Sequence, residues 1–208
     1  MRLEVQKMNK GRLIVFSAPS GCGKGTMLAE ILKDPAFRCS ISATTRAPRV
    51  GEVDGVNYHF LQKEDFLARV EKGEFLEHAE YVGNCYGTLL SEVDPYLEKG
   101  INVILEIEVQ GAMKVKEIRP DALFIFIVPP SIAELRRRLN KRGTEQADVI
   151  EKRVSEAAGE ISKAPNYDYV IVNDALEDAV SDFFAVIRAE QLKTESRREF
   201  IDEVIKNA

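Results

Sequence analysis

The sequence is short of cysteine and has no long apolar run. Its three cysteines, Cys22, Cys39 and Cys85, are widely spaced and include no C-x-x-C pair. They indicate neither a disulfide framework nor a zinc site, and they are typical of a protein in the reducing cytoplasm. No stretch reaches the ~18 apolar residues that a membrane-spanning helix needs. Residues 1–10 are charged and lack the apolar core of a secretory signal, so we expect no export.

The composition is that of an ordinary globular protein with an acidic balance. Of the 208 residues, 45% are hydrophobic and 30% are charged, and the formal net charge is −5. A chain of this length favours one domain with insertions. The negative charge argues against nucleic acid or an anionic membrane surface as the main partner. Any site for an anion must therefore be a local concentration of Lys and Arg.

One such concentration follows the first apolar strand. Residues 13–16 are apolar, and a Gly-rich turn then leads into a Lys at the start of a helix. Gly21 and Gly23 let successive backbone N–H groups point into one concavity, which binds phosphate. The positive end of the following helix and the charge of Lys24 strengthen that site.

This turn departs from the strict phosphate-loop pattern G-x-x-x-x-G-K-[ST] at two positions. Ala18 replaces the first Gly, and Gly25 replaces the hydroxyl residue, which Thr26 supplies one position later. The alternative is a Gly-rich turn with a solvated Lys. The order of strand, turn, Lys and helix favours phosphate binding. The residues expected to bind the phosphates are Ala18, Pro19, Ser20, Gly21, Cys22, Gly23, Lys24, Gly25 and Thr26.

Apolar strands alternate with helices at both ends of the chain. This alternation predicts an α/β fold with a parallel sheet covered by helices on both faces. The expected buried strands are 12–17, 102–107, 123–128 and 169–172; the other expected elements are strands at 39–45 and 75–81, a turn-rich stretch at 84–88, a helix at 63–72 and a long helical stripe at 175–206.

Two segments interrupt this rhythm and are interpreted as insertions. Residues 42–92 resemble a small α+β lobe, and residues 136–164 an Arg-rich helical lid. The core then consists of residues 1–41, 93–135 and 165–208.

Further charged residues stand at spacings that suit anion or metal chemistry. Arg46 and Arg49 lie three apart on an extended segment and are able to bind one phosphate, although exposed Arg pairs often serve only solubility. Glu106 and Glu108 lie two apart on a predicted strand, so both project from one face and suit water around Mg²⁺ or an Arg. The lid carries Arg138 and Arg142, one helical turn apart, and Arg153 on the next helix; the alternative for these is a solvated basic face.

The set of dispersed motifs resembles guanylate kinases, which transfer phosphate from ATP to GMP. The motifs occur in the order of that family from about residue 12 to residue 190. They comprise residues 18–26, 44–49 with 51–52, 75–79, 83–88, 106–111, 129–131, 142–144 and 171–174. The family usually has Asp where this chain has Glu106 and Glu108.

The resemblance implies a P-loop NTPase-type sheet with a GMP-binding lobe and a helical lid. It implies that Lys24, Arg138, Arg142 and Arg153 act on the transferred phosphate, that Asn173 lies near the adenine of ATP, and that Mg²⁺ is held mainly through phosphates and water with contributions from Thr26 and Glu106. The residues that it implies for binding the GMP phosphate are Arg46, Arg49, Tyr58 and Tyr86. Those that it implies for binding the guanine are Ser42, Glu77, Thr88 and Glu108.

The hydrogen-bonding groups of guanine suit recognition by a carboxylate. Guanine presents N1–H and N2–H₂ as adjacent donors, so a carboxylate such as Glu77 is its natural partner, whereas adenine presents an acceptor. Taken alone, Glu77 is equally well an exposed strand residue, and Tyr58 and Tyr86 are equally well packing aromatics. The resemblance implies GMP and dGMP as acceptors; the alternatives are a kinase for another monophosphate and a catalytically inactive peptide-binding module of the same fold.

Overall fold

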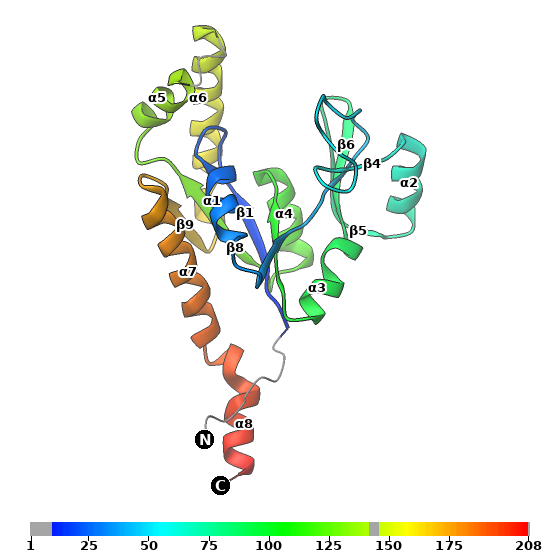
Figure 1. The fold of residues 1–208 in the computed structure, drawn as a ribbon, viewed down its shortest axis with the longest axis vertical. Coiled ribbons are helices and arrows are strands. Elements are labelled where there is room, and N and C mark those ends of the chain that lie inside the picture. The colour runs from blue at the N-terminus through cyan, green and yellow to red at the C-terminus, as the bar shows by residue number, and fades with distance from the viewer. Residues whose placement is uncertain (1–9, 142–145, 208) are drawn as a thin grey trace.

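The computed structural model describes residues 10–141 and 146–207, which form two sheets and their helices (Figure 1). The larger sheet has five strands in the order β2-β7-β1-β8-β9, and every neighbouring pair is parallel. Its strands are β1 (Leu13–Ser17), β2 (Phe37–Cys39), β7 (Asn102–Glu106), β8 (Leu123–Val128) and β9 (Tyr169–Val172). The predicted parallel sheet is confirmed. Its strand β9 lies at an edge and is partly exposed, so the prediction of a fully buried strand was wrong there.

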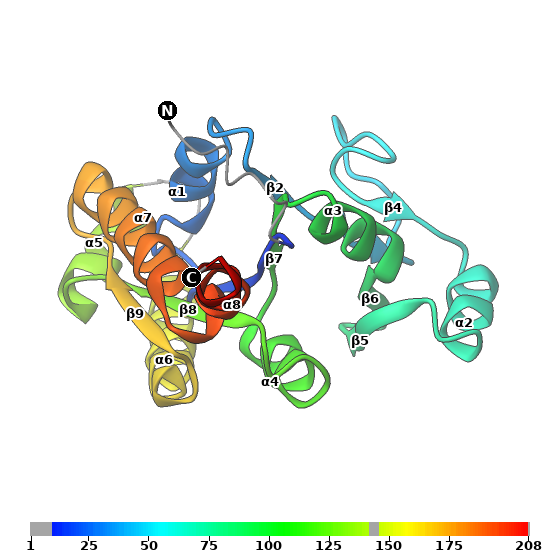
Figure 2. The same cartoon turned by 90° about the horizontal axis from the view of Figure 1, so that it is seen from below.

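Successive residues of β1 face opposite sides of this sheet, as strand geometry requires. Ile14 and Phe16 pack against α1 (Lys24–Ile31) and α7 (Leu176–Leu192). Leu13 and Val15 pack against α3 (Asp94–Glu98) and α4 (Val109–Ile118), and Figure 2 shows the helices on the two faces. Burial on both sides explains why β1 reads as a continuous apolar run.

The second sheet lies within residues 43–89 and has the strand order β4-β3-β6-β5. The turn Val82-Gly83, with φ 47° and 74°, joins its two long strands as a hairpin turn with positive φ does. The turn therefore precedes residue 84, and the prediction of a turn-rich stretch at 84–88 was wrong. The elements are β3 (Ala43–Thr44), β4 (His59–Phe60), α2 (Lys63–Glu71), β5 (Phe75–Tyr81) and β6 (Asn84–Leu89).

The predicted strand 39–45 is in fact divided between the two sheets, because β2 ends at Cys39 and β3 begins at Ala43. The chain leaves the large sheet in this interval and enters the small one. It returns through the short 3-10 helix η1 (Leu90–Glu92) into α3.

Helices α5 (Ile132–Lys141) and α6 (Ala147–Ile161) stand beside the end of the sheet at which β1 meets α1 (Figure 1). The Ser131 hydroxyl caps α5 by accepting the backbone N–H of Glu134 at 3.1 Å. The 3-10 helix η2 (Ala164–Asn166) then leads to β9. The predicted helical stripe 175–206 is two helices, because η3 (Glu195–Arg197) separates α7 from α8 (Arg198–Lys206). Among the described residues, no helix has the length and apolar character of a membrane span.

Candidate active site

The turn between β1 and α1 has the backbone of a phosphate cradle. Gly21 and Gly23 have φ values of 90° and 82°, a region that favours glycine. A β-carbon on Gly21 would lie 2.8 Å from Leu139, and one on Gly23 would lie 2.5 Å from Asn173. Both positions therefore need glycine, for the conformation of the backbone and for space.

Lys24 begins α1 and brings a positive charge to the cradle. Its side chain is 18% exposed, and its Nζ lies 3.6 Å from Oε1 of Glu106 at the end of β7. Thr26 follows in the first turn of the helix and is exposed. The lysine, the hydroxyl and the carboxylate thus lie at the carboxyl ends of the strands, where a parallel sheet binds its ligands.

A cavity of about 470 Å³ opens over the cradle. Residues 18–26 line it, together with Glu108 at the start of α4 and Glu160 in the last turn of α6. Burial raises the pKa of Glu160, and the charge of Glu108 raises it further, whereas Lys24 acts in the opposite direction. The cavity therefore brings carboxyl groups from two other elements to the cradle.

The lid rests on the cradle through apolar side chains. Burial in that contact raises the pKa of the Cys22 thiol to about 12, so the thiol stays protonated and unreactive. The buried residues of the contact are Cys22, Leu135, Leu139, Ile150, Val154 and Ala157.

Two of the predicted lid arginines reach the cradle region. Arg153 donates a hydrogen bond to the hydroxyl of Ser20, within the phosphate-binding turn. Arg138 donates to the backbone oxygen of Asn173 at 2.8 Å. Arg142, the third predicted arginine, lies outside the described residues.

Asn173 supports the cradle by a hydrogen bond to its backbone. Its side chain is buried, and its Nδ2 donates to the backbone oxygen of Cys22 at 2.7 Å. The residue was predicted to lie near the adenine of ATP. In this structure its amide holds the backbone of the phosphate-binding turn, and its place near adenine stays a prediction.

The small sheet carries a second cationic cluster. The guanidinium of Arg46 donates to both carboxylate oxygens of Glu52, at 3.0 and 2.9 Å. Its Cζ lies 5.4 Å from the centre of the Tyr58 ring, which is 6.3 Å from the ring of Tyr86. The backbone N–H of Arg49 donates to the same Glu52 at 2.7 Å. The four residues predicted to bind the GMP phosphate are therefore gathered around the Arg46–Glu52 ion pair.

This cluster lies within electrostatic range of the cradle. Burial raises the pKa of Tyr58, and the negative charge of Glu106 contributes to the rise. Glu106 is the carboxylate beside Lys24. The charge of Glu106 is therefore felt both by Lys24 and by Tyr58 of the small sheet.

A buried carboxyl group marks the predicted guanine site. Glu77 is 7% exposed, and its Oε1 accepts the hydroxyl of Thr88 at 2.9 Å. Burial raises the pKa of Glu77, while the hydrogen bond from Thr88 and the charge of Lys114 act in the opposite direction. The register of β3 with β6 places Ser42 at the level of Thr88. Ser42, Thr88 and Glu77 therefore lie in one row across the sheet.

Glu108 lines the cavity over the cradle, at the start of α4. Its predicted role in reading guanine with Glu77 stays a prediction. The same helix approaches Glu77 one turn later, where a β-carbon on Gly111 would lie 3.4 Å from Oε2 of Glu77. Helix α4 thus connects the two sites.

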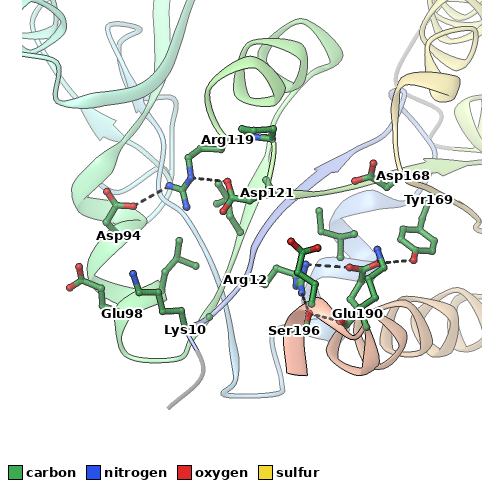
Figure 3. Close-up of a pocket in the computed structure, with 18 residues that line it drawn as sticks. Lys10, Arg12, Asp94, Glu98, Arg119, Asp121, Asp168, Tyr169, Glu190 and Ser196 are labelled. Carbon is green, nitrogen blue, oxygen red and sulfur yellow. Dashed lines mark hydrogen bonds and ion pairs between the residues drawn. The ribbon is translucent and has the colours of Figure 1, made fainter. Parts of the chain in front are cut away.

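A larger cavity, of about 1120 Å³, lies at the amino ends of the strands of the large sheet, opposite the cradle (Figure 3). None of the predicted site residues lines it. Its charged groups pair with one another: Arg12 with Glu190 at 3.2 Å, and Arg119 with Asp94 at 3.3 Å. Tyr169 also donates its hydroxyl to Glu190 at 2.7 Å. These pairs neutralise the two arginines that line the cavity.

Sequence reasoning gave no role to two carboxyl groups of the site. Glu160 follows Arg153 by seven residues on α6, and this spacing puts both on one helical face, so a signal was present. Glu52 follows Arg46 by six residues in a loop, and no periodicity connects them.

A parallel sheet with this turn, lid and inserted sheet defines the class of P-loop nucleotide kinases. The family model for guanylate kinase matches residues 10–190. The chain belongs to the guanylate kinase family.

Individual relatives agree with this assignment. The chain is 51% identical over 201 residues to a guanylate kinase of Clostridium perfringens (strain 13 / Type A), covering 96% of this chain and 93% of that one. It is 54% identical over 187 residues to a guanylate kinase of Halalkalibacterium halodurans, covering 89% and 92%. The crystal structure of guanylate kinase from Anaplasma phagocytophilum superimposes with a TM-score of 0.71 at 40% identity, covering 89% of each chain.

Proposed function

We propose that the chain transfers the γ-phosphate of ATP to GMP, and to dGMP, giving ADP and the nucleoside diphosphate. This is the reaction of the family to which it belongs. The observation that carries the proposal is the presence of two cationic groups in one fold, Lys24 in the glycine turn and the Arg46 cluster in the small sheet. Two anion sites suit a reaction between two phosphates.

The donor site is the cradle with its lid. Backbone N–H groups of residues 18–26 and the Lys24 ammonium bind the phosphates of ATP. Arg138 and Arg153, with Arg142, complete the positive charge around the phosphate that is transferred. Asn173 contributes by holding the turn that it contacts through Cys22.

The acceptor site is the small sheet, which residues 42–92 supply as a lobe. Arg46, Arg49, Tyr58 and Tyr86 bind the phosphate of GMP. Ser42, Thr88 and Glu77 read the guanine edge, and Glu108 joins them from the start of α4, which already contacts Glu77. The buried Glu77–Thr88 pair supports this role, because a carboxylate faces two adjacent donors of guanine.

The cradle also fits Mg²⁺ bound to ATP. Thr26 and Glu106 are hard oxygen donors beside Lys24, and Mg²⁺ prefers such donors. Within residues 10–141 and 146–207 no group of three His, Cys, Asp or Glu residues is arranged to hold a metal. Phosphates and water are proposed to supply most of the ligands, as Mg²⁺ keeps several waters and binds substrate phosphates. When bound, Mg²⁺ neutralises charge on the phosphates. We place the reaction in the cytoplasm, in keeping with the free thiols of Cys22, Cys39 and Cys85.

The chemical obstacle is repulsion between the two phosphates. Two like unit charges ~4 Å apart repel by ~4 kcal/mol at an effective dielectric constant of ~20. Lys24 and the arginines offset that repulsion and stabilise the charge that spreads during transfer. The GMP phosphate is already mostly ionised near neutral pH, so no general base is required. The lid excludes water, which would otherwise accept the phosphate.

A panel of acceptors tests the proposal. Purified protein with Mg²⁺ and ATP is supplied with GMP, dGMP, AMP, UMP or CMP, and ADP and the diphosphate product are measured. We expect turnover with GMP and dGMP and little with the others. Preference for another monophosphate would overturn the guanine assignment, and a folded protein without turnover would overturn the reaction.

A further inference from the structure

Both connections between the large and the small sheet pass one carboxylate, that of Glu92. The outgoing connection follows β2, and the returning connection is η1, which ends at Glu92. The side chain of Glu92 is 14% exposed and uses both oxygens. No catalytic or binding role has been assigned to it above.

One carboxylate oxygen of Glu92 binds the outgoing connection. Arg38 of β2 donates a short hydrogen bond to Oε2, and the backbone N–H of Ile41 lies 3.5 Å from the same oxygen. The Arg38 guanidinium also stacks on the ring of Tyr96 in α3, with its Cζ 3.6 Å from the ring centre. Charge and stacking together fix Arg38, so this side of the contact is anchored to the large sheet and to α3.

The other oxygen reaches the small sheet. Nε2 of His59 in β4 lies 3.0 Å from Oε1 of Glu92, and the His59 side chain is 28% exposed. The backbone N–H of His59 donates to the oxygen of Ser42 at 2.9 Å, and His59 directly follows Tyr58. A shift of His59 would therefore move residues of both the phosphate and the guanine parts of the proposed acceptor site.

We propose that Glu92 is a positioning residue of the acceptor site, because its carboxylate ties β4 to β2 and so fixes the orientation in which the small sheet faces the cradle. The inference rests on the proposed function, since it takes GMP to be the ligand of that sheet. In the orientation described here, Tyr58 already lies within range of the charge of Glu106. The contact thus preorganises the acceptor site, and its loss lowers the affinity for GMP.

The test compares Glu92→Gln with Glu98→Gln as a matched control. Glu98 ends α3, is exposed and lies only six residues further along the same connection, so the two substitutions remove the same charge from neighbouring positions. Dissociation constants for GMP and for a non-hydrolysable ATP analogue are measured by calorimetry, and KM and kcat by steady-state kinetics. We expect Glu92→Gln to raise the Kd and KM for GMP by about ten-fold, with less than about a two-fold change for ATP. Glu98→Gln should leave the Kd and KM for both nucleotides unchanged.

A second variant keeps the test valid if Glu92→Gln unfolds. His59→Ala removes only the partly exposed end of the contact, and we expect a rise of about three-fold in the Kd for GMP. Where both single variants fold, the double variant should bind GMP about as weakly as Glu92→Gln alone. Unchanged or tighter GMP binding, or equal losses for both nucleotides, would overturn the proposal. Should the wild type bind GMP but make no GDP, the proposed reaction fails, while the GMP affinities still judge Glu92.

Discussion

The cradle and the cationic cluster of Arg46, Arg49, Tyr58 and Tyr86, here called the acceptor cluster, both gather positive charge. They differ in whether backbone groups or side chains form the site. The cradle is backbone held by packing: Gly21 meets Leu139, and Cys22 is buried under the lid. The acceptor cluster is made of side chains, and Arg46 is held by a carboxylate, that of Glu52, which a phosphate must displace or share. The first site therefore depends on shape and the second on charge balance, so substitutions should affect them in different ways.

The largest difference should come from Lys24, the cation that the cradle itself supplies. Lys24→Met keeps the length of the side chain but removes the cation that follows the transferred phosphate. We expect kcat to fall by about three orders of magnitude or more. The melting temperature should change little, because Lys24 makes only a 3.6 Å contact with Glu106. Turnover close to that of the wild type would refute the role of Lys24.

The acceptor side is tested by Glu77→Gln, which preserves volume and replaces one acceptor with a donor. We expect the KM for GMP to rise by about ten- to a hundred-fold, because a donor then faces the donors of guanine. The KM for ATP should stay within about two-fold. Glu80→Gln, on the exposed part of the same strand, is the matched control. Equal losses for both nucleotides would contradict the assignment of Glu77.

The dependence of the cradle on shape is tested by two neighbouring glycines. Gly21→Ala requires φ 90° from an alanine and brings its β-carbon to 2.8 Å from Leu139, whereas a β-carbon on Gly25 meets no atom within 4 Å. We expect Gly21→Ala to lower the free energy of unfolding by about 1–3 kcal/mol. Gly25→Ala should be neutral or slightly stabilising, as alanine is in a helix. Chemical denaturation of both variants measures the difference, and similar losses would argue against steric control.

The smallest effect concerns the stability cost of burying Glu77. Its folded-state pKa is raised by burial, so the folded protein binds more protons than the unfolded chain above about pH 4.5. Stability therefore falls as the pH rises through that window. Glu77→Gln lacks this titration, so its melting temperature relative to the wild type should increase from pH 4 to pH 7. A difference that is constant with pH would show that Glu77 does not titrate in this way.

The sequence predicts the cradle and the large sheet well because their signals are local. Apolar runs define β1, β7 and β8, and the cradle is one continuous segment. Contacts between distant residues carry no such signal: Asn173 reaches Cys22 across 151 positions. The same limit explains why Glu160 was missed, since its place over the cradle depends on how α6 packs rather than on its own residues.

The small sheet was harder to predict because its strands are short and polar. Asn84 and Gly87 indicate a turn by composition, yet they belong to β6, which pairs with β5 over its length. The pairing depends on the turn at Val82-Gly83, where a valine adopts positive φ, and valine gives no warning of this. Local preference was overridden there by strand pairing.

The two connections between the sheets, at residues 40–42 and at η1, converge on the single side chain of Glu92. Both ends of the small-sheet segment are thus held at one side chain, and its strand β5 is held again by α4, where Lys114 donates to the backbone oxygen of His78. Changes to the base-reading residues that retain Arg38, Glu92, His59 and Lys114 should therefore alter base specificity while leaving the cradle in place.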